Sequence, residues 1–257
     1  MPTPAERSSL APPMARPRPR LRRAAPPSTE RYVLKDFRGS SHRILAAWIG
    51  RLPAGARVLE LGPGAAHVAR LVRRPDLRWK GLEGAVDCLP ALVGVLSGGA
   101  IVDLETIPQL PRNYDAVLAA DTLEHLSDPG RMLELIHAAL APGSPVFLSV
   151  PNIANLYVRL NLLFGRYPHA DRGLLDRTHR VLFTRRFLRS LLASAGFDIE
   201  REAVSTIPLP LAFPRLPSSL LAALSMALEG VTRLLPKLLG YQLLVVARRG
   251  GERVSFY

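Results

Sequence analysis

The chain has 257 residues, of which 48% are apolar, and its formal net charge is +13. This length and apolar content are enough to bury one sizeable core, and α/β folds of this size are often single domains. The only cysteine, Cys88, excludes an internal disulfide and a cysteine-based metal cluster. The uncharged apolar stretches are shorter than the roughly 18 residues that a membrane-spanning helix needs.

Residues 1–30 form a basic, proline-rich segment that includes Arg16-Pro17-Arg18-Pro19-Arg20. They offer little apolar surface to bury, so we predict a disordered tail. The segment has no apolar core like that of a secretory signal. Its charge suits a solvated tail, or a tail that touches acidic membrane or nucleic acid.

The first predicted element of the folded domain, residues 31–257, is a helix over residues 42–52, with Ser40 or Ser41 as its N-cap. A buried strand ending at Leu61, a glycine turn at Gly62-Pro63-Gly64 and a second helix follow. Glycines remove the Cβ atoms that would keep a ligand off the backbone, and the helix start offers unpaired N–H groups. The turn therefore suits a small polar ligand.

Further short apolar runs predict the remaining strands of a parallel sheet buried on both faces. Two of them end in an acid, Glu83 and Asp103. The predicted runs are residues 79–83, 100–104, 114–120, 145–150, 198–204 and 241–248. Helices are predicted over residues 129–140 and 185–194, the latter with Thr184 as N-cap and Gly196 as C-cap.

Two insertions interrupt this alternation, at about residues 152–180 and 207–240. The first begins with an apolar helix and ends in a polar run with His179. The second is rich in Leu and Pro, with basic residues at its ends. It suits either a helical lid packed on the domain or an interfacial helix that reaches a lipid-linked acceptor.

The glycine turn resembles motif I of the class I S-adenosylmethionine-dependent methyltransferases, in which an acid precedes G-x-G-x-G. Glu60 takes the place of the acid, Gly62 and Gly64 those of the first two glycines, and Ala66 that of the third. Ala is tolerated there if φ is negative. A dinucleotide fold would need a small residue where His67 stands, which disfavours NAD. The resemblance covers roughly residues 31–196 and the last strand.

The resemblance implies a Rossmann-like α/β fold whose seven-stranded sheet is mostly parallel, with an antiparallel last strand and helices on both faces. It also implies S-adenosyl-L-methionine as cofactor. Glu83 would accept the ribose hydroxyls, and Asp103 would lie by the adenine. The full set of implied cofactor-binding residues is Glu60, Gly62, Pro63, Gly64, Glu83, Asp103, Leu104 and Ala120.

Asp121, Glu124 and His125 resemble the E-x-x-E-H segment of the ubiquinone-biosynthesis O-methyltransferases, which can hold a divalent cation. Related methyltransferases use a similar segment without metal, so we expect no metal and keep these three as the candidate ligands. The run Asp176-Arg177-Thr178-His179 before Phe183-Thr184 resembles bacterial class I members. His179 is the candidate general base, with His125 as a second candidate; His179 could instead only fasten the loop to the sheet.

The family therefore predicts methyl transfer, most readily to oxygen, on a small, glycan-linked or lipid-linked acceptor. No specific nucleic acid is expected, because no Asn-Pro-Pro-Tyr-type tetrapeptide follows the fourth strand. We expect a cytoplasmic bacterial enzyme, with peripheral membrane contact through residues 207–240 or the basic tail as a further option. The alternative is a non-catalytic S-adenosylmethionine-binding scaffold of the same fold.

Overall fold

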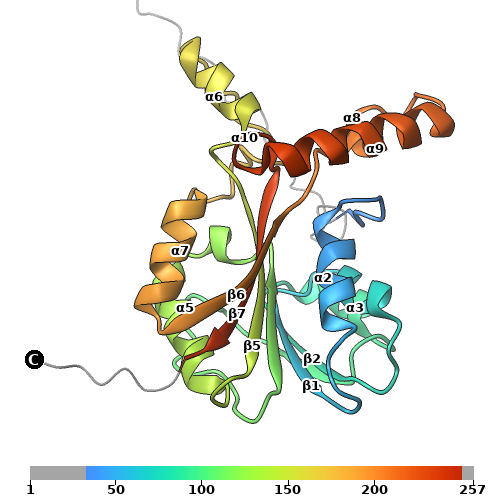
Figure 1. Cartoon of the computed structure of the whole chain (residues 1–257). Helices are drawn as coiled ribbons and strands as arrows, with labels where there is room; N and C mark the ends of the chain where they lie inside the picture. Colours follow the sequence, from blue (N-terminus) through green and yellow to red (C-terminus); the bar gives the residue numbers. More distant parts are fainter. Residues whose placement is uncertain (1–32, 251–257) are drawn as a thin grey trace, which may run out of the picture.

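The computed structural model describes residues 33–250, so the predicted disordered tail lies outside the described residues. One seven-stranded sheet forms the centre of the molecule, in the order β3-β2-β1-β4-β5-β7-β6 (Figure 1). The strands are β1 (Arg57–Leu61), β2 (Arg78–Glu83), β3 (Gly98–Ile101), β4 (Ala116–Ala120), β5 (Pro145–Pro151), β6 (Phe197–Val204) and β7 (Gln242–Arg249).

The pairing confirms the predicted fold class. Strands β3, β2, β1, β4 and β5 run parallel to one another, and β7 is antiparallel to both β5 and β6. Strands β1 and β4 are apolar and buried along most of their length, as a parallel sheet covered on both faces requires.

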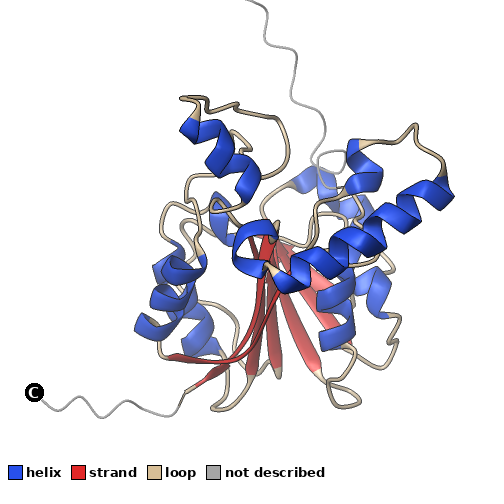
Figure 2. Cartoon of the chain, turned by 45° about the horizontal axis from the view of Figure 1, so that its top comes forward, coloured by secondary structure: helices blue, strands red, loops and turns tan. Residues whose placement is uncertain are grey.

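Helices cover both faces of the sheet (Figures 1 and 2). One face packs α2 (Ser41–Ile49) and α3 (His67–Val72), and the other packs α5 (Pro129–Ala139) and α7 (Arg185–Ser194). The remaining helices are α4 (Leu89–Leu92), α6 (Leu156–Leu163), α8 (Leu209–Ala212), α9 (Ser218–Leu234) and α10 (Pro236–Leu239), with the short 3-10 helices η1 (Val86–Cys88) and η2 (Leu123–His125).

Side-chain caps explain where the main helices begin. The Ser40 hydroxyl accepts a hydrogen bond from the Arg43 N–H at the start of α2, and the Thr184 hydroxyl accepts one from Phe187 at the start of α7. Both predicted N-caps are therefore confirmed. Helix α7 ends at Ser194, and the chain turns at Gly196 with φ of 81°.

The two predicted insertions lie together at one end of the molecule. Helix α6 follows β5, and helices α8 to α10 connect β6 to β7 (Figures 1 and 2). Both groups lie beyond the carboxyl ends of the parallel strands. No helix in residues 33–250 is long and apolar enough to span a membrane.

The α5 layer should dominate the stability of the domain. Leu133 is fully buried there, so Leu133→Ala should lower the free energy of unfolding by about 2–5 kcal/mol. The matched control is Leu163→Ala on α6, whose side chain is 75% exposed and whose loss should cost less than about 0.5 kcal/mol. Urea denaturation measures both; equal losses would contradict this view of the core.

Candidate functional site

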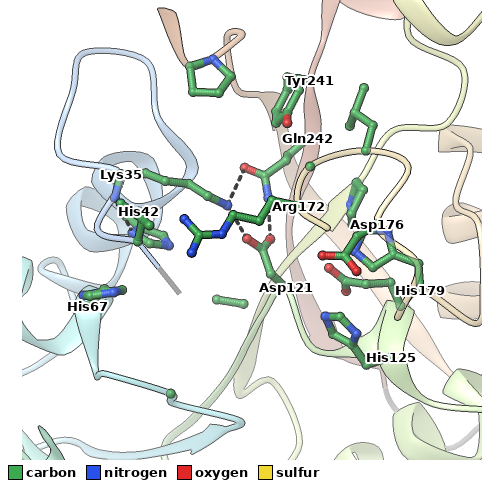
Figure 3. Close-up of a pocket in the computed structure, with 18 of the residues that line it drawn as sticks. Lys35, His42, His67, Asp121, His125, Arg172, Asp176, His179, Tyr241 and Gln242 are labelled. Carbon is green, nitrogen blue, oxygen red and sulfur yellow. Dashed lines mark hydrogen bonds and ion pairs between the residues drawn. The ribbon is translucent and has the colours of Figure 1, made fainter. Parts of the chain in front are cut away.

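A cavity of about 440 Å³ opens at the carboxyl ends of β1, β4 and β5 (Figure 3). In an open α/β sheet, ligands bind where the strand order changes direction. Here that point lies between β1 and β4, and Glu60 of β1 and Ala120 of β4 line the cavity. The α8 segment and residues 171–179 complete the lining. The cavity is therefore built by both the sheet and the two insertions.

The glycine turn forms one side of this cavity. Gly62 and Gly64 have φ of 64° and 56° and line the cavity with Pro63. A Cβ on Gly62 would lie 3.1 Å from the Thr122 hydroxyl oxygen, which donates a 2.8 Å hydrogen bond to the carbonyl of Leu61. The turn therefore lines the cavity in a conformation that favours glycine, and its contact with a ligand stays a prediction.

Ala66 corrects one expectation. The turn was expected to tolerate alanine at a negative φ, but Ala66 has φ of 53° in the left-handed region. An L-residue with a Cβ is disfavoured there, which gives a physical reason for the glycine of the family motif. Ala66 is fully buried at the N-cap of α3, so the surrounding packing maintains the strained conformation.

Glu83 fastens the turn to β2. Its carboxylate accepts hydrogen bonds from the N–H groups of Gly64 at 2.8 Å and Ala85 at 2.9 Å. The Asp103 carboxylate accepts one from the N–H of Glu105, and Leu104 is buried. None of Glu83, Asp103 and Leu104 lines the cavity, whereas Glu60 and Ala120 do. Cofactor contact by all eight predicted residues stays a prediction.

Glu60 is the buried acid of the turn. Its carboxylate accepts a 2.8 Å hydrogen bond from the indole N–H of Trp79, and 3% of the residue is exposed. Burial raises the pKa of Glu60 to about 8, although the Trp79 hydrogen bond acts in the opposite direction. Glu60 is therefore mainly a protonated, neutral carboxyl group at pH 7 in the free protein.

A second acid, Asp121, lies in the middle of the cavity (Figure 3). Its carboxylate accepts hydrogen bonds from Lys35 Nζ at 2.5 Å, Ser149 Oγ at 2.7 Å and Gln242 Nε2 at 2.5 Å. Burial acts to raise the pKa of Asp121, but the Lys35 charge and these hydrogen bonds hold it well below its usual range. Asp121 is thus a fixed anion.

Glu124, His125 and His179 gather beside Asp121 and all line the cavity. One ligand atom from each lies within 4.8 Å of the others, and the two imidazole rings are 5.1 Å apart in an edge-on arrangement. The donor set is one that a divalent transition metal accepts. Asp121 is not in this group, so the structure replaces one of the three predicted metal candidates with His179.

The protonation states of this cluster favour neutral groups. Burial raises the pKa of Glu124 well above its usual value, and neither carboxylate oxygen has a hydrogen-bond partner among the described residues. Burial and the neighbouring His125 lower the pKa of His179, whose buried Nδ1 is likewise unpartnered within residues 33–250. His179 is therefore a neutral imidazole at pH 7.

Hydrogen bonds from side chains and backbone fix the conformation of the run from Asp176 to His179. The Asp176 carboxylate accepts hydrogen bonds from both the N–H and the hydroxyl of Thr178, which closes a tight turn. The N–H groups of Arg180 and Val181 then donate to the carbonyl of Glu124. The loop is thereby fastened to η2, and His179 is placed against His125.

Sequence reasoning missed Lys35 and Gln242, which both bond Asp121. Gln242 is 3% exposed at the start of the last strand. A polar residue at the edge of an otherwise apolar strand was the available signal, because a buried amide needs partners. Lys35 stands in a mixed segment with no pattern, so only the fold reveals its role.

Comparison with known proteins identifies the family. A family model described as a methyltransferase domain matches residues 31–202. The chain belongs to this methyltransferase family. The match confirms the predicted membership of the class I S-adenosylmethionine-dependent methyltransferases, and with it the predicted cofactor.

Two curated relatives are ubiquinone biosynthesis O-methyltransferases. The protein from Pseudomonas aeruginosa strain UCBPP-PA14 is 28% identical over 106 residues, 38% of this chain and 46% of the relative. The one from Xanthomonas axonopodis pv. citri is 32% identical over 111 residues, which are 39% of this chain and 45% of that relative. The methyltransferase thus spans about half the length of the curated relatives it matches.

Solved structures share the fold. An S-adenosylmethionine-dependent methyltransferase from Mesorhizobium loti has a TM-score of 0.53 and 18% identity over 80% of this chain and 96% of its own. The magnesium protoporphyrin IX methyltransferase from Synechocystis, with bound S-adenosylhomocysteine, has a TM-score of 0.55 and 16% identity over 82% of each chain. At this identity the likeness concerns the fold alone.

The raised pKa of Glu60 gives the free protein a defined pH dependence. Its ordinary pKa is 4.5 and its folded pKa about 8, so between these values the folded state binds more protons than the unfolded chain. The free energy of unfolding contributed by Glu60 therefore falls as pH rises from about 4.5 to about 8.

Glu60→Gln should remove this dependence, because an amide does not ionise and still accepts the Trp79 hydrogen bond. Between pH 5 and 7, the variant and the wild type should diverge by about 1.4 kcal/mol per pH unit. Urea denaturation in matched buffers measures the two slopes. Parallel stability curves would show that Glu60 ionises normally.

Proposed function

We propose that this methyltransferase transfers the methyl group of S-adenosylmethionine to a hydroxyl oxygen of a small, glycan-linked or lipid-linked acceptor. The observation that carries the proposal is the neutral His179 imidazole beside the cavity, with its Nδ1 unpartnered in the described chain. Such a group can take a proton from a hydroxyl acceptor. The printed names of the curated relatives agree with oxygen as the acceptor atom.

The residues around the glycine turn fit the cofactor. S-adenosylmethionine is a cation at sulfur and carries an ammonium group, and the buried acid Glu60 faces the same cavity as the fixed anion Asp121. Gly62 and Gly64 line this cavity, and both have positive φ. The bound cofactor supplies an electrophilic methyl group. We expect Glu83 to reach the ribose, as in the family, which would require its hydrogen bond with Gly64 to rearrange.

At the acceptor side, His179 and His125 both line the cavity, and the buried Nδ1 of His179 would have to be uncovered for a hydroxyl group to reach it. As the new oxygen–carbon bond forms and the sulfur–carbon bond breaks, His179 Nδ1 would receive the hydroxyl proton. His125 would position His179, since their rings are in contact. Holding oxygen and methyl in line supplies most of the rate in such a reaction, so the base adds to a geometry already favourable.

A non-catalytic scaffold of the same fold is the competing function, and strained Ala66 is the observation that favours it. A scaffold would bind the cofactor product without turnover.

We place the enzyme in the bacterial cytoplasm, at or near the inner face of the membrane.

Calorimetric titration tests the cofactor site. S-adenosylhomocysteine should bind the full chain with micromolar affinity, and Gly64→Val and Glu83→Ala should each weaken binding at least tenfold. A side chain at Gly64 occupies the cavity lining, and loss of Glu83 releases the turn. Gly143→Ala is the matched control, because Gly143 also has positive φ but an added Cβ would meet no neighbour within 4 Å in the described chain. Tight NAD binding in place of S-adenosylhomocysteine would overturn the assignment.

Turnover tests His179. Tritiated S-adenosylmethionine would be offered with a catechol, a polyprenylated catechol, a glycoside and an ethanolamine, in separate assays. With the accepted substrate, His179→Ala should lower the rate about 10²–10⁴-fold and leave S-adenosylhomocysteine affinity unchanged. Methylation of the amine only would contradict oxygen as the acceptor atom. Binding without turnover on extracts of the source cell would favour the scaffold.

Chelation tests the metal question at the same site. We expect exhaustive dialysis against EDTA to leave the rate unchanged, since related methyltransferases use a similar segment without metal. A different result would assign the group of Glu124, His125 and His179 to a metal: the rate is lost on dialysis and restored by Mg²⁺ or Mn²⁺, and Glu124→Gln also abolishes it.

A further inference from the structure

The two insertions expose large apolar side chains around the cavity end of the molecule. We define the apical surface as the exposed large apolar side chains of two segments. One segment is α6 with residues 164–167, and the other is α8 to α10. On α6 and after it they are Tyr157, Leu160, Leu162, Leu163, Phe164 and Tyr167; on α8 to α10 they are Leu211, Phe213, Leu216, Leu220, Leu224, Met226, Val231, Leu234 and Leu235. Singly exposed apolar residues are normal, whereas a contiguous set marks an interaction site.

The buried positions of helix α9 are polar, although Ser218, Ser219 and Arg233 of the same helix are exposed. Ser225 and Thr232 are its buried residues, and the Thr232 hydroxyl has no hydrogen-bond partner in the described chain. Leu234, in contrast, is 80% exposed. A helix at a water surface normally shows the reverse arrangement. The orientation of α9 is therefore that of a helix whose outer face meets an apolar medium.

Helix α6 is almost unsupported by the domain. Val158 is its one buried residue, while Leu163 and Phe164 at its far end are 75% and 71% exposed. The helix projects away from the sheet (Figures 1 and 2). Apolar residues at the tip of a projecting helix can enter an apolar environment, such as a lipid layer, before the rest of the domain reaches it.

The charges of the same segments are mainly positive. Residues 156–172 and 207–240 together contain six basic side chains, Arg159, Arg166, Arg172, Arg215, Arg233 and Lys237. The acids are Asp171 and Glu229, and Glu229 pairs with Arg38 and Arg233. Apolar residues flanked by arginine and lysine complement an anionic lipid surface.

Hydrogen bonds hold the two parts of the apical surface together. The Asn155 side chain, which caps α6, donates to the carbonyls of Leu239 and Gly240 at the end of α10. Asn152 donates to Gly240 as well. The start of α6 is therefore fastened to the end of α10 at this end of the molecule (Figure 1).

The cavity is continuous with this surface. Pro208, Leu211 and Ala212 belong to the α8 segment and line the cavity, and Leu211 is also part of the apical surface. The opposite side of the cavity is formed by residues 171–179, which follow α6 directly. A molecule held against the apical surface thus has a direct path to His179.

We propose that the apical surface docks on an anionic lipid bilayer, with the tips of α6 and α9 inserted among the headgroups and the cavity facing the bilayer. The acceptor is then an amphipathic molecule that resides in that bilayer. This second part rests on the proposed methyl transfer, whereas docking does not.

An environment-sensitive fluorophore tests docking residue by residue. Leu163→Cys and Leu234→Cys place it on α6 and α9, and Val93→Cys, 78% exposed between β2 and β3, is the matched control. The native Cys88 is fully buried, and burial raises the pKa of its thiol to about 11, so labelling is selective. Each labelled full chain is mixed with phosphatidylglycerol vesicles and with phosphatidylcholine vesicles.

The emission at positions 163 and 234 should shift to the blue on phosphatidylglycerol, by far less on phosphatidylcholine, and not at position 93. Co-sedimentation with vesicles without a shift at 163 or 234 would overturn the proposal, because another part of the chain would then bind the lipid. A dimer in light scattering that Leu163→Glu dissociates would overturn it in favour of a second copy of the chain.

The double variant Leu163→Glu with Leu234→Glu tests the acceptor. Its turnover of a polyprenylated catechol in phosphatidylglycerol vesicles should fall at least tenfold, while its rate with a short water-soluble analogue stays unchanged. Equal loss on both acceptors would overturn delivery through the surface. If neither acceptor is methylated by the wild type, the proposed function fails, and the fluorophore shift decides docking independently.

Discussion

The carboxylate of Asp121 holds the candidate site together. It lies after β4 and bonds Lys35 from the segment before α2, Ser149 from β5 and Gln242 from β7. Four regions far apart in the sequence thus meet at one partly buried negative charge. Removal of a single partner would leave this charge less compensated, so the four regions depend on one another.

This fixed anion divides the cavity into two chemically different halves. On one side, Glu60 lies beneath the glycine turn with its pKa raised to about 8. On the other side, Glu124, His125 and His179 form a cluster in which burial raises the pKa of Glu124 and lowers that of His179. Asp121 itself raises the pKa of Glu124, because a second negative charge nearby is unfavourable. One permanent charge therefore helps to keep its neighbour protonated.

The sequence predicted the fold because its signals are local. Strands β4 and β5 are short apolar runs, Ser40 and Thr184 mark helix starts, and the glycine turn joins a strand to a helix. The site was predicted only in part. Glu60, Gly64 and His179 follow from motifs, but the contacts of Lys35 and Gln242 with Asp121 join residues 86 and 121 positions apart. The positive φ of Ala66 was also missed, since no sequence pattern distinguishes a strained alanine from a relaxed one.

The position of β7 in the sheet has a consequence for how the chain folds as it is made. Strand β7 follows the other six strands in the sequence, yet it lies between β5 and β6 and is, among the described strands, the only one that pairs with β6. Domains generally begin to fold from the N-terminal side during synthesis. Strands β1 to β5 can therefore assemble early, while β6 and the helices that follow it wait without a partner. During that interval the nascent chain exposes strand edges and apolar helices, and so depends most on chaperones just before β7 leaves the ribosome.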